Sequence, residues 1–463
     1  MAHVLFVTKY YPPEIGAAQA QNREVAIRLA RMGHQVTVLT TLPNYPTGDV
    51  PPEYCKGARR RELMDGVTVI RVWSFISANK GFFRRILAMV SFGCLAGFSG
   101  ARAVGSPDVI VAVSPPLFTA IAGRVLAWRK RRPLIFNVQD LWPEAAVQMG
   151  ALRNPLLIWL SRRLEESTYR KAKLIWAVTD GARATLIQRG VPAEKVFTLP
   201  IGADIQLFRP LPRDKARAQL GWSNEQSAGQ SDAFIVMYVG TFGLAHGLEL
   251  LVRAAERLRD HRDIRFMLIG EGATKAALMA DAERRGLENM TFLPSQPYAR
   301  MPLITAGADA CVVPLRPLPL FKHTLPSKMF EIMACGRPIL LAADGAVRRM
   351  AEQDAGAALY VEPENDAALA EAILTLKAQP ELAQTLGRRG RAYALAHFDR
   401  DRLTAQLDAR LFGGGEASDT RDTRDTRDTR DGYDRHEGHA GRDGDGDVPG
   451  VVAEPVSVSS PAR

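Results

Sequence analysis

The stretch Leu325–Leu340, LPSKMFEIMACGRPIL, holds a loop, the start of a helix and the start of a buried strand within sixteen residues. Ser327 is expected to cap the N-terminus of this helix. Gly336 stands where a left-handed residue ends a helix, and Pro338 prevents the helix from continuing. The segment therefore predicts a short helix that is followed at once by an apolar strand.

Lys328 and Glu331 are three residues apart, so both side chains lie on one face of the predicted helix near its N-terminus. A cation, an acid and the free N–H groups of a helix start suit an anionic ligand that carries hydroxyl groups. A nucleotide sugar, with two phosphates and a ribose, is such a ligand. The two residues also fit a surface ion pair on an ordinary helix, and the pattern alone leaves both interpretations open.

Apolar strands alternate with helices along most of the chain, which predicts an α/β fold with two doubly wound parallel sheets. The strands predicted in the first half are His3–Thr8, Gln35–Thr40, Val67–Val72, Asp108–Val113, Leu134–Val138 and Leu174–Val178. Those predicted in the second half are Phe234–Val239, Ile264–Ile269, Thr291–Leu293, Asp309–Val313 and Ile339–Ala343. Two such Rossmann-like domains, joined near residues 200–230, are expected to bind ligands at the C-terminal ends of their strands.

Positive charge is concentrated in the first half of the 463-residue chain. Residues 1–200 hold 27 Lys and Arg against 13 Asp and Glu, a formal charge of +14, whereas residues 201–412 carry +1 and residues 413–463 carry −5. A basic half is expected to face an anionic partner such as nucleic acid or the cytoplasmic membrane surface. No nucleic-acid-binding motif accompanies the basic clusters Arg59–Arg61 and Trp128–Arg132, so membrane contact is favoured.

The end of the chain differs in composition from the rest. Four DTR repeats, Asp419–Arg430, lead into a run rich in Gly, Asp and His that cannot bury a core, so residues 413–463 are expected to be disordered. Asp443, Asp445 and Asp447 alternate there, but a solvated acidic tail explains them better than a metal site. The four cysteines have neither paired nor metal-like spacing, and no metal site is predicted.

Three loops that contain glycine follow predicted strands. Gly16 follows the first strand, Gly240 and Thr241 follow the first strand of the second half, and Gly270 and Gly272 follow the next one. Such loops let backbone N–H groups approach a pyrophosphate. Neither G-x-G-x-x-G nor G-x-x-x-x-G-K-[ST] occurs, which disfavours a dinucleotide-dependent oxidoreductase and a P-loop NTPase.

Two titratable side chains stand near these strand ends. Asp140, in VQDLWPE, follows a predicted strand, where a carboxylate can bind an acceptor hydroxyl or carry a proton, or can simply cap the turn before Pro143. His246 is near the start of the helix after the second glycine loop and can donate to a phosphate, although a lone His is more often structural.

The apolar stretch Gly81–Val104 is short for a membrane-spanning helix, because its uncharged part runs only from Ile86 to Ala101. One interpretation is an interfacial helix with Phe82, Phe83 and the following arginines at the lipid headgroups. The other is a helix buried against the sheet. The sequence leaves both open.

Eight segments, in order along residues 1–400, resemble those of glycosyltransferase family 4: YYPPEIGAA, GHQVTVLTTLPNYPTG, SPPLF, QDLWPE, LPIGADIQLFRP, VGTFGLAHGLELL, LIGEG and LPSKMFEIMACGRPIL. The chain is most similar to the bacterial O-antigen and exopolysaccharide branch, which includes fucosaminyl and colanic-acid transferases. The resemblance implies the GT-B architecture, with two Rossmann-like domains facing a cleft. It also implies retaining transfer of a sugar from a nucleotide-diphosphate sugar, with UDP as the expected nucleotide, and neither a metal nor a cofactor besides this donor substrate.

The resemblance also divides the chain into parts with expected roles. They are an acceptor-binding domain (residues 1–200), a linker and entry to the second domain (201–232), a donor-binding domain (233–395), a C-terminal helix (396–412) and the tail (413–463).

Several residues inherit expected roles from the family's motifs. Glu331 has the position of the second motif glutamate, which holds the ribose hydroxyls, whereas His323 replaces the first one, eight residues earlier. Thr241 and His246 stand near the places of the usual Arg and Lys on the glycine loop, and Gln139 replaces the common His before Asp140. The expected catalytic residues are Asp140, Glu331 and His323. The expected donor-binding residues are Gly16, Gly240, Thr241, His246, Gly270, Gly272, Ser327, Lys328 and Glu331, with Lys328 supplying positive charge to the diphosphate.

The implied acceptor is a saccharide linked to a lipid diphosphate. The resemblance and the basic first domain together predict a cytoplasmic protein that is peripheral on the inner membrane, where it contacts anionic lipid and no nucleic acid. Two other classes stay open: a nucleotide-sugar epimerase of the same shape, and a non-catalytic scaffold that binds nucleotide sugar or membrane. Product analysis with the donor alone separates the epimerase from the transferase. Glu331→Ala should abolish transfer if the chain is an enzyme, whereas unchanged polysaccharide output in cells that carry it favours the scaffold. Within the enzyme class, a soluble acceptor such as a small metabolite also stays open.

Overall fold

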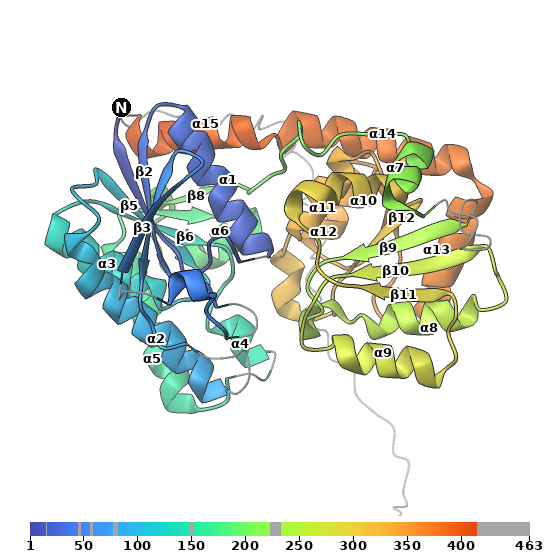
Figure 1. The fold of residues 1–463 in the computed structure, drawn as a ribbon, viewed down its shortest axis with the longest axis horizontal. Coiled ribbons are helices and arrows are strands. Elements are labelled where there is room, and N and C mark those ends of the chain that lie inside the picture. The colour runs from blue at the N-terminus through green and yellow to red at the C-terminus, as the bar shows by residue number, and fades with distance from the viewer. Residues whose placement is uncertain are drawn as a thin grey trace, which may run out of the picture. The chain divides into compact units, whose positions relative to one another are not determined.

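The computed structural model describes residues 1–14, 16–44, 48–55, 59–76, 82–148, 150, 152–222 and 233–413. These residues belong to one unit, Met1–Gly415, and form two sheets with helices on both faces (Figure 1). Of the predicted disordered tail, residues 414–463 lie outside the described residues, including the DTR repeats and the alternating aspartates.

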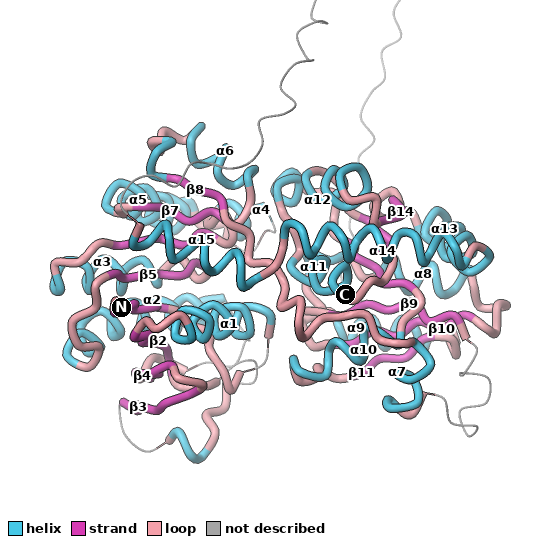
Figure 2. The backbone as a smooth tube through the Cα atoms, turned by 90° about the horizontal axis from the view of Figure 1, so that it is seen from above, coloured by secondary structure: helices cyan, strands magenta, loops and turns pink. Residues whose placement is uncertain are grey.

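The first sheet consists of β1 (His3–Val7), β2 (Gln35–Thr41), β3 (Arg59–Met64), β4 (Val67–Val72), β5 (Val109–Ser114), β6 (Leu134–Val138), β7 (Leu174–Ala177) and β8 (Val196–Thr198). Its order is β3-β4-β2-β1-β5-β6-β7-β8, and the strands labelled in Figure 2, β3, β4, β2, β5, β7 and β8, follow this order. All neighbours are parallel except the antiparallel pair β3–β4.

The second sheet consists of β9 (Phe234–Val239), β10 (Ile264–Ile269), β11 (Met290–Leu293), β12 (Ala310–Pro314), β13 (Ile339–Ala342) and β14 (Ala358–Tyr360). Its order is β11-β10-β9-β12-β13-β14, and every pair is parallel. The predicted α/β architecture with two doubly wound sheets is confirmed.

Helices connect the strands. Those of the first half are α1 (Ala17–Arg31), α2 (Phe82–Ser99), α3 (Thr119–Lys130), α4 (Glu144–Gln148), α5 (Pro155–Lys171) and α6 (Asp180–Gln188). Those of the second half are α7 (Arg213–Leu220), α8 (Glu249–Arg257), α9 (Lys275–Arg284), α10 (Met301–Gly307), α11 (Ser327–Ala334), α12 (Ala346–Arg348), α13 (Asp366–Ala378), α14 (Pro380–His397) and α15 (Arg400–Phe412).

Both faces of the first sheet are buried, which explains the continuous apolar run of β1. Leu5 and Val7 belong to the core under α2 and α3, whereas Val4 and Phe6 belong to the core under α1 and α15. Successive side chains of a strand point to opposite faces, so a strand covered on both faces must be apolar at every position.

The last helix, α15, packs on the first sheet although the chain reaches it from the second. Its Leu403 and Leu407 are buried in the core that contains α1. The N–H of Ala203 donates to the carbonyl oxygen of Phe398 (2.9 Å), and the carbonyl oxygen of Ala203 accepts from the N–H of Arg400 (3.0 Å). Arg28 of α1 forms ion pairs with Asp204 and Asp401. The segment that leaves the first sheet and the helix that returns to it are therefore joined where the chain crosses between the sheets.

Helix α2, for which two interpretations were open, is half-buried. Phe92 and Ala96 are fully buried, and Gly93 lies so close to α3 that a Cβ there would meet the carbonyl oxygen of Phe118 at 2.3 Å. On its other side Phe83 and Phe98 are 79% and 55% exposed. The helix thus packs against the sheet and keeps an apolar outer side. Among the described helices, none is sufficiently long and apolar to cross a bilayer.

Three strands were not predicted, and one capping assignment was wrong. The strands are β3, β8 and β14, so Arg59–Arg61 is part of an edge strand. Helix α11 does begin at Ser327, but its N-cap residue is Pro326 and no side chain caps it. Gly336 is left-handed, with φ +67°, and its N–H donates to Met333 (2.9 Å), which confirms the predicted helix end.

Candidate active site

Two glycine loops meet at the carboxyl edge of the second sheet. Gly240 follows β9, and Gly270 and Gly272 follow β10; all three have positive φ, between +146° and +156°. A Cβ on Gly270 would stand 1.9 Å from the carbonyl oxygen of Gly240, and one on Gly272 would stand 2.4 Å from that of Phe242. The two loops therefore pack backbone against backbone, which only glycine allows.

Lys328, in the first turn of α11, reaches this loop pair. A Cβ on Gly240 would be 2.8 Å from its Nζ atom, and the ammonium lies 4.0 Å from the centroid of the Tyr238 ring. The Nζ atom is buried and has no hydrogen-bond partner in the described part of the chain. Burial lowers the pKa of Lys328 to about 7, although the nearby Glu331 carboxylate raises it. The structure thus brings the Lys328 cation, which has no hydrogen-bonding partner among the described residues, against the Gly240 loop.

Glu331 lies one turn further along α11 and is held by two residues from other elements. Tyr298 donates its hydroxyl hydrogen to Glu331 Oε1 at 3.0 Å, and Arg400 Nη1 donates to the Tyr298 hydroxyl oxygen at 3.1 Å. Burial raises the pKa of Glu331 to about 7, while Arg400, the Tyr298 hydrogen bond and Lys328 all lower it and Glu24 of α1 raises it. This carboxyl group therefore titrates near neutral pH.

Sequence reasoning missed Tyr298 and Arg400. Arg400 is almost fully buried and also donates to the carbonyl oxygens of Ile201 (3.2 Å) and Gly202 (2.7 Å). It thus links the Glu331 carboxylate to the backbone segment that connects the two sheets. No motif marks either residue, because they lie 33 and 69 positions from Glu331 in the chain.

The other two predicted residues of the Gly240 loop, Thr241 and His246, lie near Lys328. Thr241 is exposed, and its carbonyl oxygen accepts a hydrogen bond from the Tyr238 hydroxyl at 2.7 Å. Burial and the charge of Lys328 lower the pKa of His246 to about 3. The imidazole is therefore neutral at physiological pH, so it can donate one N–H to a phosphate but adds no positive charge.

His323 lies in the 3-10 turn Pro319–His323 after β12. It is exposed and faces Gly181 in the first turn of α6, where a Cβ would meet His323 Nδ1 at 2.4 Å. Both residues follow the carboxyl ends of parallel strands, β12 and β7. The carboxyl edges of the two sheets therefore face each other at this contact.

Asp140 and Gly16 stand at the carboxyl edge of the first sheet. Asp140 follows β6, and the residue as a whole is exposed. The surrounding protein nevertheless displaces water from its carboxyl group, which raises the pKa of that group. Gly16 precedes α1 in an extended conformation, and a Cβ there would meet only the end of the flexible Gln19 side chain. The structure thus separates the predicted residues into a set on the second sheet around α11, the pair Asp140 and Gly16 on the first sheet, and His323 at the contact.

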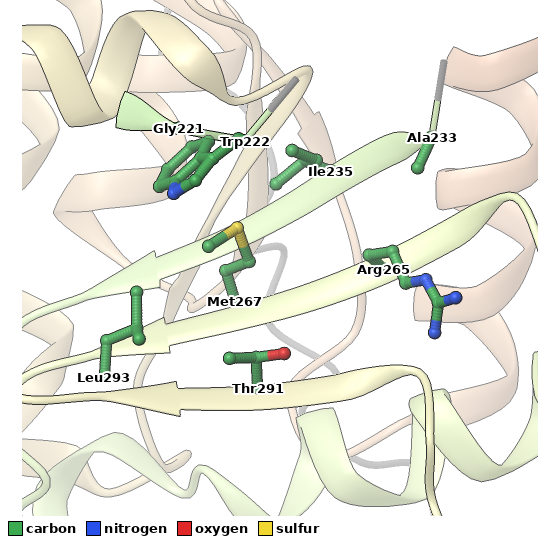
Figure 3. Close-up of a pocket in the computed structure, with 8 residues that line it drawn as sticks. All are labelled: Gly221, Trp222, Ala233, Ile235, Arg265, Met267, Thr291 and Leu293. Atoms are coloured by element: carbon green, nitrogen blue, oxygen red, sulfur yellow. The ribbon is translucent and has the colours of Figure 1, made fainter. Parts of the chain in front are cut away.

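Within the described residues, no group of three or more His, Cys, Asp or Glu side chains is placed to hold a metal ion. A cavity of about 220 Å³ lies elsewhere, against one face of β9, β10 and β11 (Figure 3). Figure 3 shows Arg265, Met267 and Thr291 among its lining residues, with Trp222 above them. None of the predicted site residues lines it.

Two family models match consecutive parts of the chain. Residues 16–202 match the glycosyl transferase 4-like domain, and residues 223–393 match the glycosyl transferases group 1 domain. Among curated proteins, the chain is 29% identical over 406 residues to WcaI of Escherichia coli K12, described as a colanic acid biosynthesis glycosyl transferase, covering 86% of this chain and 96% of that protein. It is 27% identical to D-inositol 3-phosphate glycosyltransferase 1 of Catenulispora acidiphila, with coverages of 84% and 90%.

Solved structures share the fold. Sucrose-phosphate synthase from Thermosynechococcus elongatus superposes with a TM-score of 0.67 at 21% identity, covering 90% of this chain and all of that one. Anabaena Alr3699/HepE in complex with UDP-glucose superposes with a TM-score of 0.64 at 19% identity, with coverages of 89% and 99%. Because the two family models together match well over half of the chain, the protein belongs to the glycosyltransferases and consists of a 4-like domain followed by a group 1 domain, in a GT-B-like fold.

Proposed function

We propose that this glycosyltransferase moves a sugar from a nucleotide-diphosphate sugar, with UDP as the nucleotide, to a lipid-linked saccharide in bacterial surface polysaccharide synthesis, with retention of configuration. The single observation that carries the donor assignment is the buried ammonium of Lys328, which stands without a hydrogen-bond partner against the Gly240 loop. A buried charge is stable only when something compensates it, and the diphosphate of a donor would do so.

The residues around Lys328 suggest how transfer is assisted. As the sugar leaves, negative charge grows on the diphosphate, and Lys328 with the N–H groups of the glycine loops would stabilise it. Glu331, fixed by Tyr298, would accept hydrogen bonds from the ribose hydroxyls. We propose that the acceptor hydroxyl attacks on the side from which the nucleotide departs and that its proton passes to the departing phosphate. On this proposal no metal and no resident cofactor take part.

The comparisons support this proposal. HepE was solved with UDP-glucose and shares the fold, and WcaI is named for colanic acid synthesis, a polysaccharide pathway. Asp140, at the carboxyl edge of the first sheet, remains the candidate for contact with the acceptor hydroxyl. His323, which lies against α6 and stands in the place of the family's first motif glutamate, remains a candidate catalytic residue.

We also propose that the first domain contacts an anionic membrane at the cytoplasmic face of the inner membrane. Two of its helices expose apolar residues next to a pair of arginines. These are Phe83 and Leu87 beside Arg84 and Arg85 in α2, and Leu156, Trp159 and Leu160 beside Arg162 and Arg163 in α5. Aromatic and basic side chains in this mixture favour a headgroup interface. Flotation of the full chain with vesicles of 30% anionic lipid should be strong at low salt and weak at high salt. If the protein stays with the unbound fraction at low salt, the membrane proposal fails.

The donor site is tested by thermal shift with UDP-, GDP-, dTDP- and ADP-linked sugars. A ligand that binds the folded state raises the melting temperature, and we expect a shift with the UDP sugars only. Glu331→Ala should remove the shift, whereas Glu283→Ala, which deletes an exposed carboxylate of the same domain, should keep it. The absence of a shift with all four nucleotides, or an equal shift in Glu331→Ala, would contradict the proposed donor site.

Product analysis then separates the remaining classes. Incubation with the donor alone should leave the sugar unchanged, and a membrane extract should be needed for transfer. A changed sugar without acceptor would identify an epimerase. Binding without any reaction in the presence of extract would identify a scaffold.

A further inference from the structure

The first sheet carries a lysine, Lys9, whose side chain is largely buried. Lys9 follows β1, a central strand, by two residues, so it stands at the carboxyl edge where ligands of such sheets bind. Its side chain is only 6% exposed. Its carbonyl oxygen accepts a hydrogen bond from Thr40, but its ammonium makes no hydrogen bond or ion pair with any residue that the structure describes. The proposed donor site on the second sheet does not include Lys9.

The charges of two residues from neighbouring elements act on Lys9. Glu14 lies in the loop before α1, and Arg85 lies exposed in the first turn of α2. Burial lowers the pKa of Lys9 to about 8; the Glu14 charge opposes this shift and the Arg85 charge adds to it. With that pKa, about nine in ten molecules still carry the positive charge at pH 7. The Glu14 carboxylate accepts a hydrogen bond from the backbone N–H of Asn44 at 2.8 Å, so its own charge is partly satisfied.

The residues around Lys9 indicate which kind of anion would bind beside it. Arg85 adds a second cation near Lys9, and Phe83 and Leu87 of the same helix expose apolar side chains, the former by 79% and the latter by 50%. Two cations next to exposed apolar surface match a ligand in which a phosphate group is joined to a hydrocarbon chain.

We propose that Lys9, flanked by Arg85, binds a phosphoryl group of the lipid-linked acceptor at the carboxyl edge of the first sheet. The identity of this acceptor rests on the proposed function. Phosphoryl oxygens could also come from the donor, and the two sources are separable because the donor has its own cation in Lys328.

The test uses the full chain and calorimetric titration with farnesyl diphosphate, a short prenyl diphosphate, in the presence of saturating UDP. The variants are Lys9→Met, and Lys173→Met as a control that removes an exposed lysine of the same domain. We expect Lys9→Met to weaken binding of farnesyl diphosphate at least tenfold, which is the loss of one charge-assisted contact. Lys173→Met should change it less than twofold, and neither variant should change the affinity for UDP.

Each other result overturns the assignment. Unchanged binding of farnesyl diphosphate by Lys9→Met, or no binding by the wild type, removes the acceptor site. A loss of UDP affinity in Lys9→Met would assign Lys9 to the donor's phosphates instead. If UDP itself does not bind, the proposed donor site fails, while the farnesyl diphosphate titrations of wild type and variant still decide on Lys9.

The melting temperature shows whether Lys9→Met loses binding only because it no longer folds. Methionine keeps the shape of the largely buried lysine stem and removes an ammonium that makes no hydrogen bond with a described residue, so Lys9→Met should melt at or above the temperature of the wild type. A clear fall would show that Lys9 is structural and would overturn the proposal.

Discussion

Replacing Tyr298 by Phe removes a single oxygen atom from the group that holds the Glu331 carboxylate. The lost contact is the hydroxyl that donates to Glu331 Oε1 at 3.0 Å. Arg400 keeps its bonds to the carbonyl oxygens of Ile201 and Gly202, so the guanidinium stays in place. The change therefore isolates the hydrogen bond between the phenol and the carboxylate.

The magnitude follows from the charge that this bond stabilises. A hydrogen bond to an ionised group contributes about 1.5–3 kcal/mol, and 1.36 kcal/mol corresponds to one pKa unit. Because the bond favours the ionised carboxylate, its loss should raise the pKa of Glu331 from about 7. A rise of about one unit would lower the ionised fraction at pH 7.5 from about three quarters to about one quarter, while at pH 9 both proteins would be more than about nine-tenths ionised.

The assay is UDP affinity measured by calorimetry between pH 6 and pH 9. If the ionised Glu331 carboxylate accepts the ribose hydroxyls, Tyr298→Phe should bind UDP about threefold more weakly at pH 7.5 and nearly as well as the wild type at pH 9. Tyr54→Phe, which removes another tyrosine hydroxyl that donates to a glutamate (Glu62, 3.4 Å), should leave the profile unchanged. An equal loss of affinity at every pH would refute the coupling to Glu331, since lost packing or lost shape does not titrate.

Three further results are expected. Lys328→Met should raise the melting temperature by a few degrees, because it removes a buried ammonium without a hydrogen-bond partner, and should abolish the thermal shift with UDP; a lower melting temperature with retained UDP binding would contradict this role. Gly270→Ala should lower the free energy of unfolding by about 2 kcal/mol or more, because its Cβ would meet the carbonyl oxygen of Gly240. Gly286→Ala, where φ is also positive but no atom lies within 4 Å of the added Cβ, should cost clearly less in the same urea titration. Arg28→Met should lower the melting temperature, because it leaves the carboxylates of Glu24, Asp204 and, in α15, Asp401 without their guanidinium partner; an unchanged melting temperature would show that α15 is held without these ion pairs.

Most of the fold could be predicted because the strands that bury both faces are apolar throughout. β4, β6, β9 and β10 were predicted with the bounds that the structure has. β3 was missed because RRRELM is an edge strand, in which Arg61 is exposed and Arg60 pairs with Glu62. β8 and β14 were missed because three residues are too few to show a period.

The site was predictable only where its residues share one element or follow a strand. Lys328 and Glu331 are three residues apart on α11, and helical geometry alone puts them together. The predicted cap at Ser327 was wrong, because Pro326 already occupies the N-cap position and leaves no side-chain bond to the helix. Tyr298 and Arg400 could not be found, since a contact between distant elements leaves no local pattern.

Local interactions therefore determined the two doubly wound sheets, the glycine turns at their carboxyl edges and the Lys–Glu pair on one helix, because the hydrophobic period, glycine's freedom and helical spacing act within a few residues. Tertiary structure alone decided which charges are buried. Lys9 and Lys328 look like ordinary surface lysines in the sequence. Only packing buries most of the Lys9 side chain and leaves the Lys328 ammonium buried without a hydrogen-bond partner among the described residues. Packing likewise decided that α15 returns to the first sheet and that Arg400 connects this crossing to Glu331, since both depend on contacts between segments that lie far apart in the chain.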